Sequence, residues 1–229
     1  MRKFFAVALG SAVALMGFAG AANASATVDL VWIDTSITDT SGATCLKAAN
    51  RNCTQLGTTL STVAVTDNIS LVAILTAGPG GVLSANMSID YGNALPKVSV
   101  VSFRRFNTKP YLPSSLGQMS DIPPFIDNIN AVAVPFLSQG VGLPNGFTAY
   151  IGTATFHKDQ LISGLSEFKV GVNGPGMVDA ITRLTDGVNI SSTVTFNSAF
   201  LLNVPEPGAL SMLAMGLGGM LLAGRGRRS

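Results

Sequence analysis

Two cysteines and one histidine carry the most reactive side-chain chemistry in this chain of 229 residues. Cys45 and Cys53 are separated by seven residues, which is wider than the C-x-x-C spacing of redox pairs. A metal site would need more ligands than these two and the distant His157 provide. In an exported chain, two nearby thiols favour a disulfide that closes a small surface loop, so we predict a Cys45–Cys53 bond.

The motifs of hydrolytic enzymes are absent from the sequence. There is no G-x-S-x-G around a serine to serve His157, and no H-E-x-x-H. The chain has only two glutamates, Glu167 and Glu206, and a glycosidase would have to use aspartates such as Asp121 and Asp127, which flank "IPPFI". The sequence therefore predicts no catalytic residue and no cofactor, and a secreted hydrolase is the least favoured interpretation. No metal ligand is assigned; calcium could use some of Asp34, Asp39 and Asp186, but turn formation is the better account of these aspartates.

Aromatic side chains offer a different chemistry, the stacking of sugar rings. Tyr91, Phe103, Phe106 and Tyr111 lie close together in the sequence. Tyr91 and Phe103 fall on predicted core-facing positions of strands, so core packing is the better interpretation for those two. Phe106 and Tyr111 remain as candidates for an exposed carbohydrate contact.

The first 26 residues have the pattern of a secretory signal peptide. Arg2 and Lys3 precede the uncharged apolar stretch 4–21, and "ANA" and "ASA" at 22–26 each offer a small-x-small cleavage site. We therefore expect residues 1–26 to be a signal helix that directs export through the secretory translocon.

Charge excludes nucleic acid as a partner. Residues 27–204 contain nine Lys/Arg and eleven Asp/Glu, a net charge near −2, and their largest basic cluster is Arg104-Arg105. A nucleic-acid-binding face would need a larger basic patch.

The pattern of residues 27–203 is that of β-strands. In Leu83–Tyr91, five apolar residues alternate with four polar ones, as a half-buried strand requires. Further predicted strands are 28–33, 60–65, 69–75, 98–103, 131–136, 147–156, 168–172 and 190–196, and the segments "TAGPGGV" and "VNGPGM" predict turns. About nine short strands predict an all-β fold, an antiparallel β-sandwich with Greek-key or similar connections.

Three segments depart from this strand pattern. Short helices are expected in the Cys45–Cys53 loop and over His157–Leu165. Residues 104–145 contain six prolines and predict a long loop region with one embedded strand. Long loops in compact domains are often functional, so the binding surface is expected there.

Residues 204–229 combine three features in order. Pro205-Glu206-Pro207 form an extended, accessible segment, and seventeen residues without charge follow from Gly208 to Gly224. Arg225, Arg227 and Arg228 then act as a stop-transfer cluster that stays cytoplasmic. We expect a single C-terminal transmembrane helix, with the β domain outside the cytoplasmic membrane.

This order of features resembles the PEP-CTERM sorting signal of Gram-negative bacteria. The resemblance covers about 26 residues, "VPEPGALSMLAMGLGGMLLAGRGRRS". It implies recognition by exosortase through Pro205, Glu206 and Pro207, removal of the tail, and a final place at the cell surface or in an exopolysaccharide or biofilm matrix.

The β domain is also similar to cohesin-like bacterial sandwich modules in residues 65–95, where a strand, a Gly-rich turn and an alternating strand follow one another. This resemblance implies a fold and no ligand. Together the observations predict an exported, non-enzymatic structural or adhesive protein; the alternative is a secreted carbohydrate-binding module.

Overall fold

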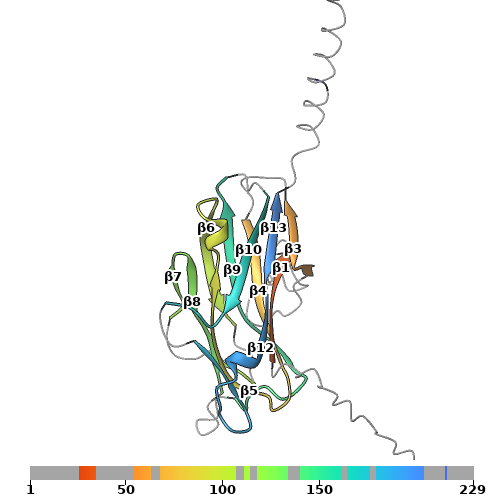
Figure 1. Ribbon diagram of the computed structural model, residues 1–229, viewed down its shortest axis with the longest axis vertical. Helices are drawn as coiled ribbons and strands as arrows, with labels where there is room; N and C mark the ends of the chain where they lie inside the picture. The colour runs from red at the N-terminus through yellow and green to blue at the C-terminus, as the bar shows by residue number, and fades with distance from the viewer. Residues whose placement is uncertain are drawn as a thin grey trace, which may run out of the picture.

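The computed structural model describes residues 26–34, 54–62, 68–106, 111–113, 118–133, 140–160, 164–175 and 179–203, together with Met215. The β domain within these ranges is built from two sheets packed face to face (Figure 1). The sequence prediction of an all-β sandwich is confirmed.

The first sheet has six strands in the order β12-β1-β4-β9-β6, with β2 beside β1. Antiparallel pairing joins all of them except β1 and β12, which are parallel. The strands are β1 (Ala26–Asp34), β2 (Thr54–Gly57), β4 (Asn68–Ala77), β6 (Val98–Arg105), β9 (Thr148–Lys158) and β12 (Val194–Asn197).

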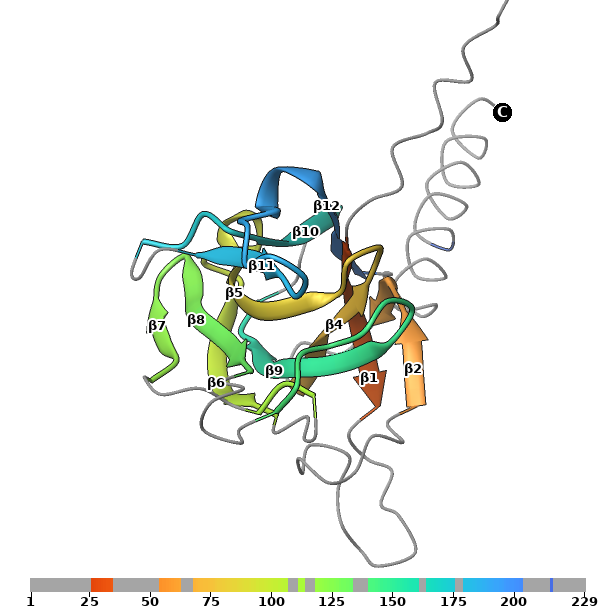
Figure 2. The same cartoon turned by 90° about the horizontal axis from the view of Figure 1, so that it is seen from below.

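The second sheet has seven strands in the order β3-β13-β10-β5-β8-β7, with β11 beside β5. Its edge strand β3 is parallel to its neighbour β13, and its other pairs are antiparallel. The strands are β3 (Thr59–Thr62), β5 (Val82–Asp90), β7 (Ser120–Ile122), β8 (Phe125–Val132), β10 (Leu165–Gly171), β11 (Ala180–Arg183) and β13 (Ala199–Asn203). In Figure 2, β5 and β10 of this sheet lie across the core from β4 and β9 of the first.

Aromatic side chains fill the space between the sheets. Trp32 packs edge-on against Phe168 with ring centres 5.2 Å apart, and its indole N–H donates to the carbonyl of Phe200 at 2.8 Å. Phe168 in turn contacts Phe156 at 5.1 Å, and Phe156 contacts Tyr91 at 5.5 Å. Because these rings come alternately from the two sheets, they tie the sheets together by burying a large apolar area.

Strand β4 is buried on both faces. Leu71, Ala73 and Leu75 face the main core, whereas Val72 and Ile74 belong to a second, smaller cluster of buried residues. A strand covered on both sides needs a continuous apolar run, which is what residues 69–75 contain.

Most predicted strands are confirmed, with boundaries shifted by a few residues. The alternation predicted for β5 is correct: Ala85, Met87, Ile89 and Tyr91 lie in the main core, and Leu83 packs against it. Strands β2, β7, β11 and β13 were not predicted, because segments of three to five residues are too short to show a period.

Three predictions were wrong. The strand placed at 131–136 begins earlier, as β8 at Phe125, inside the region taken as a proline-rich loop. The helix placed over His157–Leu165 is absent from its described residues, since β9 runs through Lys158 and β10 begins at Leu165. The sheets are also not purely antiparallel, because β12 and β3 add parallel edges.

Several predictions concern residues outside the described ranges. These are the signal peptide up to residue 25, the Cys45–Cys53 disulfide, the Pro205-Glu206-Pro207 motif and the arginines Arg225, Arg227 and Arg228. Among the residues that the structure describes, no helix has the length and apolar character to cross a membrane.

Candidate functional site

The candidate site lies on the outer face of the second sheet, where β10 stops pairing with β5 and β11 begins to pair with it. Strand β10 ends at Gly171, opposite Ser88, and β11 begins at Ala180, opposite Asn86. Both strands pair with β5, and Gly174 and Asp179 are described residues that lie between them in the chain.

A β-bulge in β8 orients the second half of the site. Ile89 pairs with Ile126 and Met87 pairs with Ile129, so Asp127 and Asn128 together face Ser88. Asn128 has a left-handed backbone with φ of 61°. A bulge redirects side chains, and here both isoleucines reach the core while Asp127 turns to the outer face.

Asp127 and Asp179 approach each other across Gly174. A Cβ atom at Gly174 would collide with the Asp127 Oδ1 atom and would lie 2.8 Å from Asp179 Oδ2 and 2.9 Å from the Cβ of Ser88. The backbone N–H of Gly174 donates to Asp179 Oδ2 at 2.9 Å. A glycine is thus the residue that allows both carboxylates to reach this place.

Both carboxylates are buried and incompletely paired. Asp127 is 1% exposed and Asp179 8% exposed, and the Oδ1 atom of each has no hydrogen-bond partner among the described residues. Neither buried aspartate forms an ion pair with a described lysine or arginine; the ion pairs that the described residues do form include Lys169–Glu167 and Arg183–Asp186. Burying a carboxylate without such a partner is costly.

The electrostatics of Asp179 reflect this environment. Burial raises the pKa of its carboxyl above the ordinary value, and the negative charge of Asp127 raises it further. Hydrogen bonds from the Gly174 N–H and the Ser88 hydroxyl act in the opposite direction. The site therefore favours whatever neutralises negative charge.

A polar network continues from the bulge toward the first sheet. Arg105 of β6 donates to the side chain of Asn130, Asn130 donates to the side chain of Asn128, and Asn128 donates to the carbonyl of Gln118 at 2.7 Å. Partial burial lowers the pKa of Arg105. An open depression of about 280 Å³ beside this network is lined by Phe103, Arg104, Arg105, Gln118 and Met119.

The structure separates the residues that a hydrolase would have used. Asp121 pairs with Ile126 and Ser120 with Asp127, so Asp121 and Asp127 project from opposite faces of the β7–β8 ladder. Asp121 instead accepts a hydrogen bond from the Tyr91 hydroxyl at 2.6 Å. His157 contacts the Asn68 side chain at 2.9 Å, as a surface residue at a strand end does.

One aromatic pair combines a half-buried ring with an exposed one. Tyr111 packs on Phe147 with ring centres 5.2 Å apart, and Phe147 is 46% exposed. Phe106 was expected beside Tyr111 at the surface, but it is buried in the smaller cluster against Val72. The exposed partner of Tyr111 is therefore Phe147, which follows the proline-rich region.

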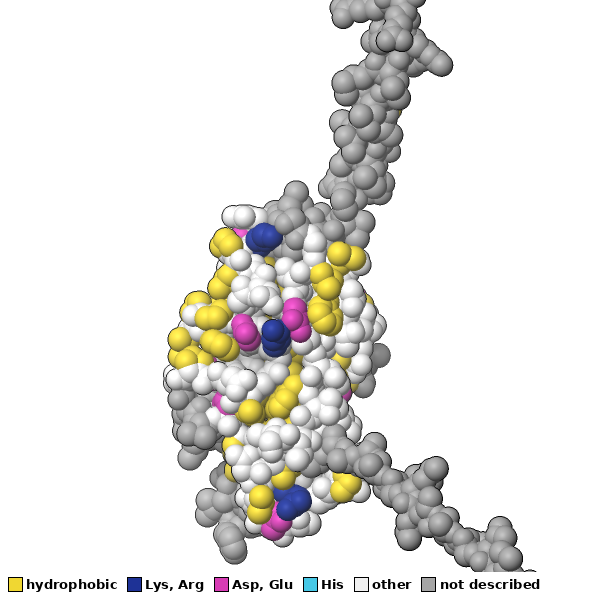
Figure 3. All heavy atoms as spheres, viewed as in Figure 1, with side chains coloured by type: hydrophobic (Ala, Val, Ile, Leu, Met, Phe, Trp, Pro, Cys, Tyr) yellow, Lys and Arg dark blue, Asp and Glu magenta, His cyan; other side chains and the backbone are white. Residues whose placement is uncertain are grey.

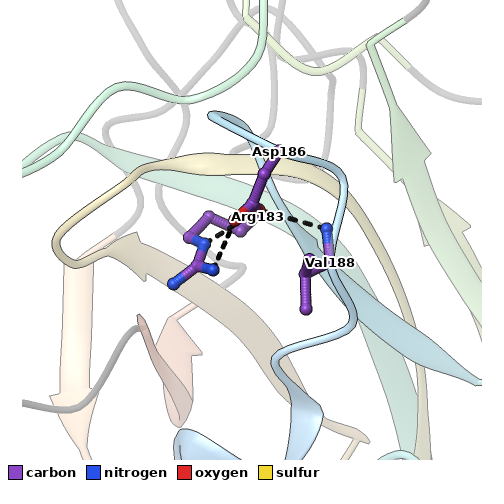
Figure 4. A network of polar contacts seen from close by, with 3 residues as sticks. All are labelled: Arg183, Asp186 and Val188. Carbon is purple, nitrogen blue, oxygen red and sulfur yellow. Dashed lines mark hydrogen bonds and ion pairs between the residues drawn. The ribbon is translucent and has the colours of Figure 1, made fainter.

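Charged side chains are sparse over the face shown in Figure 3, where they lie singly or in small groups among polar and apolar atoms. The most complete ion pair closes the turn after β11: Arg183 donates from Nε to Asp186 Oδ1 at 2.9 Å, and the Val188 N–H donates to the same oxygen at 3.2 Å (Figure 4). This arrangement stabilises a turn and reaches no cavity.

In the described ranges, no three His, Cys, Asp or Glu side chains gather as a metal-ligand set. Asp127 was identified in the sequence, but its partner Asp179 was missed. The two are far apart in the chain, and no local motif marks Asp179; the turn signal "VNGPGM" before it was the nearest indication.

The fold and the tail define two similarities to known proteins. Residues 203–228 match the sequence model of the PEP-CTERM protein-sorting motif, and cohesin modules are among the solved structures whose fold is similar to that of the β domain. The match begins at Asn203, the last residue of β13, so the sorting motif follows directly on the last strand of the sandwich. Both resemblances noted in the sequence are confirmed. No curated protein matches the chain significantly.

Similar solved structures are cohesin modules at low sequence identity. The seventh ScaB type I cohesin of Pseudobacteroides cellulosolvens is 11% identical with a TM-score of 0.46, and the alignment covers 79% of this chain and 92% of that one. A non-cellulosomal cohesin of Archaeoglobus fulgidus is 13% identical with a TM-score of 0.43, over 68% and 93% of the two chains. Similarity of this degree concerns the fold alone.

Proposed function

We propose that this chain is an exported, non-enzymatic protein that exosortase sorts to the cell surface or extracellular matrix, where its β-sandwich has a structural or adhesive role. The observation that carries the proposal is the PEP-CTERM match at residues 203–228, directly after the last strand of a folded β domain. This order is the one expected of an exported domain followed by its sorting signal.

The proposed division of the chain keeps a sorting signal in 204–229 and a β domain that ends at residue 203, but moves the end of the signal peptide from residue 26, as predicted from sequence, to Ala24. Of the two small-x-small sites, cleavage after Ala24 fits the domain better than cleavage after Ala26. Ala26 is the first residue of β1, is 1% exposed and pairs with Ala77 and Val194. Removing it would cost β1 its first pairing positions.

In the precursor, the apolar stretch before Arg225 would hold the chain in the cytoplasmic membrane, with the three arginines inside. Exosortase would then act near Pro205-Glu206-Pro207 and release the domain from its tail. An exopolysaccharide or biofilm matrix is the proposed destination, because exosortase sorting is associated with such matrices.

A non-enzymatic role is supported by how the described polar residues are used. His157 contacts Asn68, Asp121 holds the Tyr91 hydroxyl, and the Ser198 hydroxyl donates to Glu167 at 2.7 Å. Each of these groups has a structural partner, and none forms a nucleophile–base pair of the kind that hydrolysis needs.

The two glutamates of the chain provide a matched test of sorting. Glu206→Gln changes the centre of the motif, whereas Glu167→Gln changes a partly exposed strand residue of β10. We expect the Glu206→Gln precursor to accumulate in the membrane fraction with its tail, and the Glu167→Gln protein to be processed normally. Normal processing of Glu206→Gln would argue against recognition of the motif.

The exposed ring of Phe147, packed on the half-buried Tyr111, favours one second function, a carbohydrate-binding module. Tilted aromatic rings at a surface provide faces on which sugar rings stack. Phe147→Ala should then weaken retention on the host's own exopolysaccharide in affinity electrophoresis, while Val101→Ala, at a similarly exposed apolar residue of β6, should leave it unchanged. Equal retention of both variants would count against this function.

A further inference from the structure

We infer that Asp127 and Asp179 form a calcium-binding site on the outer face of the second sheet, beside Gly174. This inference goes beyond the proposed function and does not depend on it, because the site lies entirely within the folded domain.

Asp127 and Asp179 are buried at a cost in free energy, because neither carboxylate is fully paired. Two carboxylates that are 1% and 8% exposed face the same glycine, and one oxygen of each lacks a hydrogen-bond donor in the described structure. Buried carboxylates are normally paired with a cation, hydrogen-bonded throughout or bound to a metal. No lysine or arginine of the described residues forms an ion pair with either one.

The backbone conformation at Asn128 and the glycine at 174 bring the two carboxylates together. The bulge in β8, with its left-handed Asn128, turns Asp127 outward, and the chain leaves β5 after Gly171 so that Asp179 can return beside it. Gly174 has no side chain where a Cβ would collide with Asp127. Strained backbone positions such as that of Asn128 occur most often at functional sites.

The donor atoms select the kind of cation. Carboxylate oxygens and the hydroxyl of Ser88, which is hydrogen-bonded to Asp179, are hard oxygen ligands. Calcium accepts such ligands in irregular geometry, whereas magnesium demands a near-octahedral shell and zinc prefers nitrogen and sulfur. Two carboxylates correspond to a weak site of the extracellular type, with a Kd of about 0.1 to 1 mM.

Thermal unfolding of the full chain tests the inference. At pH 7.5, about 10 mM calcium chloride should raise the Tm by about 3 to 10 °C relative to EGTA, from ligand linkage at this affinity and the size of the domain. About 10 mM magnesium chloride should give less than a third of that shift, since it fits the site poorly.

The variants separate calcium binding from a general effect on folding. Asp127→Asn and Asp179→Asn remove the charge and keep the shape, so in EGTA each should melt at or above the Tm of the original chain, and calcium should no longer shift it. Asp186→Asn is the control, because it changes an exposed aspartate in a turn and should keep the full calcium shift.

Isothermal titration with calcium checks the same variants without heating. One site with a millimolar or tighter Kd in the original chain, lost in Asp127→Asn, supports the inference. An absent calcium response, an equal response in Asp127→Asn, or an equal response to magnesium would overturn it. If the asparagine variants have a raised Tm in EGTA but calcium does not change the Tm of the original chain, the inference is overturned, and the two carboxyls share a proton instead of binding calcium.

Discussion

Asp127 and Asp179 face each other across Gly174, although one belongs to a central strand pair and the other to a loop that leaves the same sheet. Each keeps one buried oxygen without a donor in the described structure. The site that they form is the most unusual polar feature of a sandwich whose interior is otherwise aromatic and aliphatic.

The close approach at Gly174 predicts that any side chain at this position destabilises the fold. Gly174→Ala places a methyl group against the Asp127 carboxylate and should lower the free energy of unfolding by about 1 to 3 kcal/mol. Gly171→Ala is the matched control, since its Cβ would meet only Asn173 Nδ2 at 3.8 Å, and we expect it to leave stability unchanged or to raise it by up to about 1 kcal/mol. Urea unfolding monitored by the fluorescence of Trp32 measures both; equal costs would contradict this account of the glycine.

The left-handed backbone of Asn128 predicts that glycine is more stable than alanine at this position, the reverse of the ordinary order in a strand. Asn128→Gly and Asn128→Ala both remove the hydrogen bonds to Gln118 and Asn130, but only alanine must hold a Cβ at a φ of 61°. The alanine variant should therefore be less stable than the glycine variant by about 1 kcal/mol in urea unfolding.

Asn197 in β12 provides the control for this comparison, because it is an exposed strand residue whose backbone φ is not positive. There the ordinary order should hold, with glycine less stable than alanine by about 0.5 to 1 kcal/mol. Finding the same order at both positions would show that the bulge imposes no conformational demand at Asn128.

The turn after β11 predicts a small pH dependence of stability. The hydrogen bond from Arg183 is the main cause that holds the pKa of Asp186 below its ordinary value, and the Val188 N–H adds to it. A carboxyl whose pKa is lower in the folded chain stabilises the fold above its unfolded pKa, and this stabilisation is lost as the pH falls through the folded pKa. The original chain should therefore melt slightly above Asp186→Asn at pH 6, and the difference should shrink progressively as the pH falls below about 4, the pKa of an unperturbed aspartate.

The Arg183→Gln background isolates the ion pair in this experiment. Without the guanidinium, Asp186→Asn should change the Tm by much less, and by nearly the same amount at both pH values. The effect is expected to be modest throughout because both side chains are partly exposed. An unchanged pH-dependent difference in the Arg183→Gln background would assign it to another group.

The strands with clear local patterns were predictable from sequence, and those shaped by distant contacts were not. The alternation in Leu83–Tyr91 predicted the core face of β5, because one face of that strand packs on the core and the other is polar. Strand β8 was misplaced because its polar residues Asp127, Asn128 and Asn130 are buried by other elements, and its bulge breaks the period of two. Long-range pairing overrides composition in such segments.

The candidate site was predictable in only one of its parts. The region 104–145 was chosen for a binding surface because of its prolines, and Asp127 does lie in it. Asp179 and Gly174 join it only through the pairing of β10 and β11 with β5. The sorting motif is the opposite case: its residues are contiguous, so sequence alone identified it, and the PEP-CTERM match confirms it.

Removal of the tail is tested most directly by the intact mass of the protein recovered from the surface or matrix of its own host, compared with a strain that lacks exosortase. We expect the mass from the competent strain to end near Pro205-Glu206-Pro207, without the arginines at 225, 227 and 228, and the mass from the deficient strain to include them. The same C-terminal mass in both strains, with the tail intact, would contradict the sorting function.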